Sequence, residues 1–322
     1  YYANIAEFDT AKSLYDLLKK DYEELDEVVP IYAHSLNLGY GFIDSILGRH
    51  QSAYDRTMEA LKYYDQETQN SGEKLGMDTG ILCHTWAGLH QIWLGYPEQA
   101  RAHIQSILNI AAGYHLKLIT KDAFWYCGWI SFELGDYDSA RAYTEAVLAL
   151  SIKEHYFLFE GAARIFKGRI LSLYGKHQEA IKSIQKGLDM YFQTGIVTPR
   201  VDYLYMLAEI YCAAGQVDDG LETIRYPEAA PEETGQGRYK SALQRVKGDL
   251  YLLRGDETAA EDAYHQAIDI AQADGTKLFE LEASKRLARL WRNQGKEDHA
   301  VQMLQEIYDW FTEGFDMSML VE

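Results

Sequence analysis

Histidines are the side chains of this 322-residue sequence best suited to transfer protons or bind a metal, so their spacing tests for catalysis first. His34, His84 and His90 could each act as a general acid or base near neutral pH. His84 and His90 lie six residues apart, which does not match the i, i+4 spacing of a metal site on one helix face. We therefore interpret these residues as surface or core-edge histidines of helices.

Motifs of other enzyme classes are missing. The sequence has no H-E-x-x-H motif, no nucleophile elbow and no Walker A motif. The stretch "TGQGRYKS" (234–241) has two glycines without the spacing of a phosphate loop. The acidic stretch 21–27 is typical of a solvated helix start. We expect no enzyme activity, no cofactor and no metal ion in this chain.

A second group of residues combines aromatic rings with alternating charges, which suits a groove for a peptide or a polar small molecule. Rings supply stacking area, charged groups orient hydrogen bonds, and arginines favour an anionic partner group. These residues fall at positions that we expect on the concave side of a helical repeat, described below. The predicted groove residues are Trp125, Trp129, Arg169, Tyr205, Glu209, Arg245, Asp249 and Arg289.

Both halves of this prediction have a structural alternative. The two tryptophans are one helical turn apart and would also suit packing against the next hairpin. The three arginines would also suit ion pairs within the protein. Their candidate partners for such pairs are Asp202, Glu209 and Asp249.

The elements that must position these residues follow from an internal repeat. Seven glycines recur along the chain, the last six at intervals of 40 residues. A small residue lies five positions after each glycine, as Ala140 follows Gly135 in "FELGDYDSARAYTEAVLAL" (132–150), and another lies seven positions before it. The repeat glycines are Gly48, Gly95, Gly135, Gly175, Gly215, Gly255 and Gly295.

This pattern predicts tandem helical hairpins. Each glycine ends one helix in a left-handed cap, the Asp, Pro or Glu that often follows opens the next helix, and the small residues let the two helices approach closely. One hairpin cannot bury its apolar face alone, so neighbouring hairpins stack. We predict an all-α, right-handed superhelix with seven full hairpins and one partial hairpin, in repeats of ~40 residues. It forms a single domain over 1–322, with loops at 66–80 and 225–238.

The spacing resembles that of the tetratricopeptide repeat, in which a small residue is followed by a turn glycine and then by an alanine. The consensus Trp, Leu and terminal Pro positions match poorly. The period of 40 residues also exceeds the usual ~34 residues, which indicates longer helices or turns. The resemblance implies a superhelix that binds a ligand or a protein.

Two further stretches, "IYDWFTEGFD" (307–316) and "LGYPEQA" (94–100), resemble the C-terminal sensor region of a bacterial family of signalling proteins. That family joins a class III nucleotide cyclase or another effector to a STAND-type ATPase and a long tetratricopeptide sensor. Its members usually have Thr and then Asp where this chain has Met317 and Met319. The resemblance implies a sensor module that regulates a covalently linked ATPase or effector domain and performs no catalysis itself.

The composition narrows the class of partner. A formal net charge of −18 argues against nucleic acid and against an anionic membrane surface. Three widely spaced cysteines indicate reduced thiols and a cytoplasmic location, and the sequence has no apolar run long enough for a membrane span. Because the sequence begins with Tyr1 rather than Met, we interpret it as part of a longer protein.

These observations predict a protein or peptide partner, with a small anionic ligand as a further option. The alternative function is a free-standing tetratricopeptide scaffold or adaptor that mediates protein–protein assembly. A third interpretation is self-assembly through the exposed ends of the superhelix.

Overall fold

The computed structural model describes residues 8–25, 28–66, 76–196, 200–229, 237–315, 317 and 320. Within these residues the chain forms fifteen α-helices and no strand. They are α1 (Phe8–Glu23), α2 (Pro30–Ile46), α3 (His50–Lys62), α6 (Thr79–Leu94), α7 (Pro97–Ala112), α8 (Lys117–Glu133), α9 (Tyr137–Glu154), α10 (Phe157–Leu173), α11 (His177–Phe192), α12 (Arg200–Ala213), α13 (Val217–Ala229), α14 (Lys240–Arg254), α15 (Glu257–Asp274), α16 (Lys277–Asn293) and α17 (Glu297–Tyr308).

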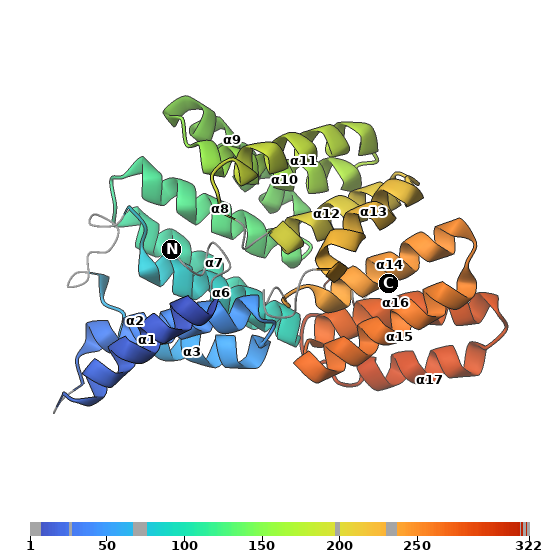
Figure 1. The fold of residues 1–322 in the computed structure, drawn as a ribbon, viewed down its shortest axis with the longest axis horizontal. Coiled ribbons are helices and arrows are strands. Elements are labelled where there is room, and N and C mark those ends of the chain that lie inside the picture. The colour runs from blue at the N-terminus through green and yellow to red at the C-terminus, as the bar shows by residue number, and fades with distance from the viewer. Residues whose placement is uncertain are drawn as a thin grey trace.

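Consecutive helices pair into hairpins (Figure 1). Helix α2 packs against α3, α6 against α7, and the same pairing continues to α16 and α17. Helix α1 packs against α2 in the manner of the second helix of a preceding hairpin. The prediction of seven full hairpins and one partial hairpin is therefore confirmed within the described residues.

The repeat glycines form the turns of these hairpins. All seven have a positive φ, between 70° and 99°. At Gly135 the chain leaves α8 with a φ of 77°, and Asp136 then caps α9 by accepting a hydrogen bond of 3.1 Å from the Ser139 amide. A side chain at such a backbone position would be strained, which explains why glycine recurs there.

The small residues lie where the paired helices touch. A Cβ atom added to Gly168 on α10 would lie 2.9 Å from the carbonyl oxygen of Ala180 on α11. Ala180 is fully buried, and so is Ala140, the corresponding residue of α9. Any larger side chain in these two columns would push the helices apart.

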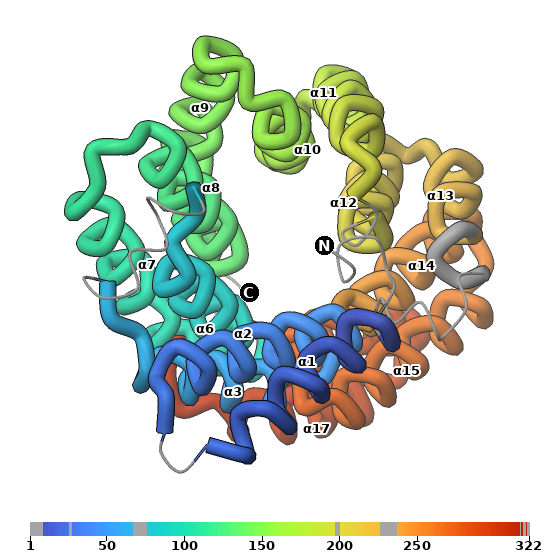
Figure 2. The backbone as a smooth tube through the Cα atoms, turned by 60° about the vertical axis from the view of Figure 1, so that its left-hand side comes forward, coloured from blue at the N-terminus to red at the C-terminus, as the bar shows by residue number. Residues whose placement is uncertain are grey.

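The hairpins stack into a right-handed superhelix that curves back on itself (Figure 2). Viewed along its axis, the chain turns clockwise as it recedes from the N-terminal hairpins toward the C-terminal ones. The first helix of the last hairpin, α16, packs against α6 of the second full hairpin. The superhelix is therefore closed, with α8, α10, α12, α14 and α16 on its inner side.

Aromatic packing holds this closure together. Trp93 of α6 is fully buried, and its ring centroid lies 5.5 Å from that of Tyr239 and 6.2 Å from that of Phe279. The backbone also contributes, because the Gly237 amide donates a hydrogen bond of 2.8 Å to the Ile46 carbonyl. One buried hydrophobic cluster consequently runs from α6 to α16.

The two predicted loops are shorter than expected where they are described. Residues 76–78 lie outside regular structure, but α6 already begins at Thr79. Residues 225–229 are helical and belong to α13, so the prediction of a loop from 225 is wrong there. Pro227 has a φ fixed near the helical value and removes only one hydrogen bond, so the helix continues to Ala229. Residues 67–75 and 230–236 lie outside the described residues.

The buried alanine column gives a direct test of the hairpin geometry. We expect Ala140→Phe to overpack the α8–α9 contact and to lower the free energy of unfolding by about 1–3 kcal/mol. Urea denaturation measures the change. Ala142→Phe on the exposed face of the same helix is the control. Equal effects of the two substitutions would contradict the packing described here.

Candidate functional site

The inner side of the superhelix contains a cavity of about 500 Å³. Its wall comes from α8, α10, α12, α14 and α16, so it spans five consecutive hairpins. Apolar side chains such as Phe132, Leu173, Met206 and Phe279 alternate there with ionisable ones. The charged lining residues are the acidic Glu133, Glu209, Asp249 and Glu282 and the basic Arg169, Arg245, Lys285, Arg286 and Arg289.

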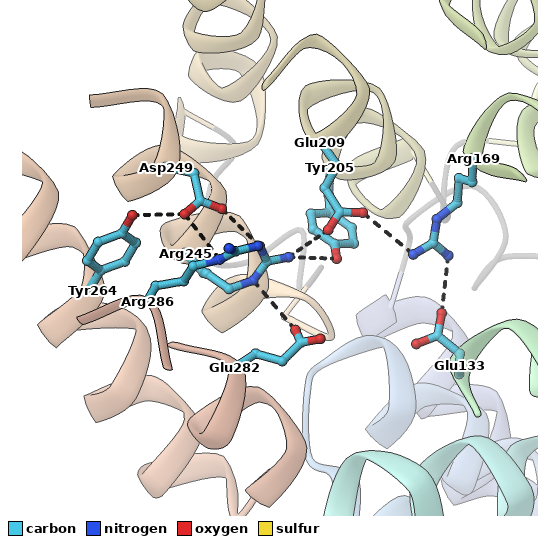
Figure 3. A network of polar contacts seen from close by, with 9 residues as sticks. All are labelled: Glu133, Arg169, Tyr205, Glu209, Arg245, Asp249, Tyr264, Glu282 and Arg286. Carbon is cyan, nitrogen blue, oxygen red and sulfur yellow. Dashed lines mark hydrogen bonds and ion pairs between the residues drawn. The ribbon is translucent and has the colours of Figure 1, made fainter. Parts of the chain in front are cut away.

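Arg245 lies at the centre of a network of ion pairs (Figure 3). Its guanidinium nitrogens lie 2.6 Å from a Glu209 carboxylate oxygen, 3.1 Å from one of Asp249 and 3.5 Å from one of Glu282. It also donates a hydrogen bond of 3.4 Å to the Tyr205 hydroxyl. A single arginine of α14 thus connects carboxylates from α12, α14 and α16.

Both ends of the network extend beyond Arg245. Asp249 accepts a hydrogen bond of 2.8 Å from the Tyr264 hydroxyl and pairs with Arg286 at 3.4 Å. At the other end, Arg169 lies 3.5 Å from Glu209 and 3.2 Å from Glu133.

The Arg169 guanidinium contacts two carboxylates and an aromatic ring. Its guanidinium carbon lies 3.9 Å from the ring centroid of Phe132, in addition to its two carboxylate partners. Glu133 is held in turn by a hydrogen bond of 3.4 Å from the Trp93 indole nitrogen. The alternative that the arginines pair within the protein is therefore correct for Arg169 and Arg245.

The electrostatics follow from burial and from the alternating charges. Burial would lower the pKa of Arg245, but the carboxylates of Glu282, Glu209 and Asp249 outweigh it, so that pKa lies above its usual value. Burial would raise the pKa of Glu209, but Arg245 and Arg169 hold it below its usual range. Burial dominates at Glu282 and raises its pKa. The carboxyl of Glu282 is therefore the most easily protonated acid of this network among those with a resolved shift.

The network is accessible from the cavity at particular groups. The side chains of Arg286, Glu282 and Glu209 are 41%, 30% and 27% exposed, whereas those of Arg245 and Arg169 are 8% and 9% exposed. A molecule in the cavity would meet the outer three groups, while the two inner arginines support them.

Six of the predicted groove residues line this one cavity. They are Arg169, Tyr205, Glu209, Arg245, Asp249 and Arg289.

The two predicted tryptophans are not in it. Trp125 and Trp129 are 7% and 6% exposed and pack between hairpins. The Trp125 ring lies 4.8 Å from that of Phe166, and the Trp129 ring lies 5.7 Å from that of Trp86. The prediction that they line the groove is wrong, because Phe166 of α10 covers Trp125 and Trp86 of α6 covers Trp129.

Three residues of the network, Glu133, Glu282 and Arg286, were not predicted as site residues. Glu133 lies two positions before its repeat glycine and Glu282 lies thirteen before its own, whereas the predicted groove residues all lie six or ten positions before theirs. A search for acids at these two further inward offsets would have found both, but not Arg286, which lies nine positions before Gly295. Asp202, expected as a partner of the arginines, instead pairs with the buried Arg238 at 2.8 Å.

The histidines singled out in the sequence lie away from the cavity. The Nδ1 of His34 lies 2.9 Å from the Ala60 carbonyl oxygen, and His84 and His90 pair with His103 and His50 at 2.8 Å and 3.2 Å. Burial lowers the pKa of His34, His84 and His90, so these rings are neutral structural members at neutral pH. Among the described residues, no three His, Cys, Asp or Glu side chains are grouped to hold a metal ion. The described helices also include none with the length and apolar character of a membrane span.

Comparison with known proteins agrees with this architecture. Residues 204–284 match a family model described as a tetratricopeptide repeat-like domain. The apo form of the quorum sensor NprR from B. thuringiensis superposes with a TM-score of 0.53 and 14% identity, over 94% of this chain and 82% of that one. The chain therefore has a tetratricopeptide-like helical fold.

Two other proteins are similar over much of the chain. A tetratricopeptide repeat protein from Parabacteroides merdae ATCC 43184 has a TM-score of 0.48 and 13% identity, over 90% of this chain and 98% of that one. The uncharacterized protein R02095 of Rhizobium meliloti (strain 1021) is 22% identical over 264 residues, which are 77% of this chain and 24% of that protein. This chain therefore spans about a quarter of the length of that relative.

The two ion pairs of Arg169 lead to a stability prediction. Arg169→Ala leaves Glu133, whose side chain is 9% exposed, without its cation. We expect the free energy of unfolding to fall by about 3 kcal/mol, because a buried charge loses its partner.

The matched control is Arg141→Ala. Arg141 is 49% exposed and pairs with Asp138, which is 86% exposed, so its removal should change stability by less than about 0.5 kcal/mol. Urea denaturation of both variants measures the two changes in the free energy of unfolding. A loss at Arg169 no larger than that at Arg141 would mean that Arg169 has no structural role.

Proposed function

We propose that this chain is the ligand- or partner-binding module of a signalling protein and that its inner cavity is the binding site. The observation that carries the proposal is the partly exposed ion-pair network on the cavity wall. Burying charges is costly for stability, and a concave cavity in which polar groups converge among apolar ones is typical of a binding site. The network thus occupies the place where a ligand would be oriented.

The chemistry of the wall indicates the class of ligand. Arg286 presents a cation at the cavity, Glu282 and Glu209 present carboxylate edges, and the remaining wall is rich in apolar and aromatic groups. A short peptide, or another polar molecule with an anionic group and an apolar part, could bind Arg286, donate hydrogen bonds to the two carboxylates and contact the apolar wall. A purely cationic or purely apolar molecule would remove water from some of these charged groups without offering them a hydrogen-bonding partner in its place.

The signalling context is the second part of the proposal. The stretches 94–100 and 307–316 resemble those of sensors that regulate an attached STAND-type ATPase or cyclase. R02095 is about four times as long as the part that matches this chain, which is compatible with a multidomain arrangement. NprR, a quorum sensor, shows that a sensor can use this fold. We propose a cytoplasmic sensor that regulates a covalently linked ATPase or effector.

One observation favours the alternative function of a scaffold. Leu14 and Leu17 on α1 are 49% and 61% exposed, and α1 is the first helix among the described residues. Such an apolar surface suits protein–protein contact. In that case a partner would bind at the N-terminal end and the cavity would stay empty.

A thermal-shift screen of short peptides and polar metabolites tests the proposal, because a ligand selective for the folded state raises the melting temperature. For a hit with an anionic group we expect Arg286→Ala to weaken binding about tenfold or more in isothermal titration calorimetry. Arg254→Ala is the matched control, since Arg254 is 48% exposed, pairs with Asp218 and lies outside this cavity. Equal affinities for both variants would contradict the assignment of the site.

A further inference from the structure

The segment that follows α17 reaches back to the second full hairpin. The Trp310 ring lies 5.6 Å from the ring of Tyr96, in the turn between α6 and α7. The fit is close on both sides, because a Cβ atom added to Gly95 would lie 2.5 Å from the Trp310 ring and one added to Gly314 would clash with Pro97. We call the contact between residues 309–315 and residues 95–99 the clasp.

The clasp supplies a missing helix cap. Tyr96, the residue before α7, makes no side-chain capping hydrogen bond. Instead, a carboxylate oxygen of Glu313 accepts hydrogen bonds of 3.0 Å and 3.3 Å from the amides of Glu98 and Gln99. The α7 amides thereby gain the anionic acceptor that a helix N-terminus favours.

The contact is reciprocal. The Glu98 carboxylate accepts a hydrogen bond of 2.9 Å from the Gly314 amide, and the Gln99 side chain donates one of 3.2 Å to Glu313. Two acids therefore each satisfy the backbone of the other segment, as in a capping box, but across more than two hundred residues of sequence. The hydrogen bonds of Glu313 are exposed to water, so they can break without unfolding a hairpin.

Helix α16 connects the clasp to the cavity. Its first residue, Lys277, has its ammonium nitrogen 5.6 Å from the centroid of the Trp310 ring. Two and five residues further along α16, Phe279 and Glu282 form part of the cavity wall, and Phe279 also packs against Trp93 of α6. The clasp thus contacts the start of a helix that both lines the cavity and takes part in closing the superhelix.

We propose that the clasp controls the opening of the cavity and responds to its occupancy. This inference rests on the proposed function of the cavity as a binding site. A ligand that joins Glu282 or Arg286 of α16 to Glu209 of α12 favours the closed superhelix and hence the closed clasp. By reciprocity the closed clasp raises the affinity for that ligand. The two stretches singled out in the sequence, 94–100 and 307–316, contain the two segments of the clasp.

The clasp can be tested without a ligand, because one cysteine lines the cavity. Cys212 lies in the wall, whereas Cys83 and Cys127 are fully buried. Cys212 is partly buried in that wall, so the rate at which its thiol is modified reports how accessible the cavity is. We expect Glu313→Ala to increase the rate of Cys212 modification by N-ethylmaleimide, followed by mass spectrometry, about fivefold, as loss of one cap shifts an opening equilibrium.

Hydrogen exchange at the Glu98 and Gln99 amides reports the clasp itself and should accelerate in the same variant. Glu306→Ala, which removes an exposed glutamate of α17, is the matched control and should change neither rate. Unchanged exchange in Glu313→Ala would overturn the clasp, and faster exchange with an unchanged Cys212 rate would overturn its control of the cavity. Neither result depends on whether the peptide screen finds a ligand, so the two proposals fail separately.

Discussion

The contact between α6 and α16 closes the superhelix and thereby sets where the inner helices lie. A stack of hairpins is a one-dimensional array in which each unit touches only its neighbours. Here the buried Trp93 joins two hairpins far apart in sequence, through Tyr239 and Phe279. The same indole donates to Glu133, which holds Arg169. Closure of the superhelix and the order of the cavity wall therefore share one side chain.

The alternation of charge on the cavity wall follows from its geometry. Five helices present their inward faces to one small volume, so like charges on adjacent helices would repel at short range. The arginines of α10 and α14 instead alternate with carboxylates of α8, α12 and α16. Such a network adds little to the stability of a core, because removing the charges from water costs free energy, but it holds a few charged groups in fixed positions. It leaves Arg286, Glu282 and Glu209 as the groups that a bound molecule would meet.

The hairpins were predictable from sequence because their constraints are local. A turn glycine such as Gly135 needs a positive φ, and a small residue such as Ala140 needs a close helix contact, so each leaves a mark at a fixed spacing. The contact that closes the superhelix produces no regular spacing in the sequence, because Trp93 and Phe279 belong to different repeats. The burial of Trp125 and Trp129 could not be predicted for a related reason. The position of a residue within the repeat indicates which side of the hairpin it lies on, but not how completely the next hairpin covers it. The pairing of Arg169 and Arg245 was open in the sequence and is settled by distances.

Closure of the superhelix can be checked by measuring the distance between its second and its last full hairpin. Spin labels at Ala102 on α7 and Gln302 on α17, both exposed, would sit on the two hairpins that the closure brings together. With Cys212 replaced by serine, double electron–electron resonance should give one narrow distance distribution, because the two hairpins are held by a buried aromatic contact. A broad distribution extending to long distances under native conditions would show an open superhelix and would contradict this account.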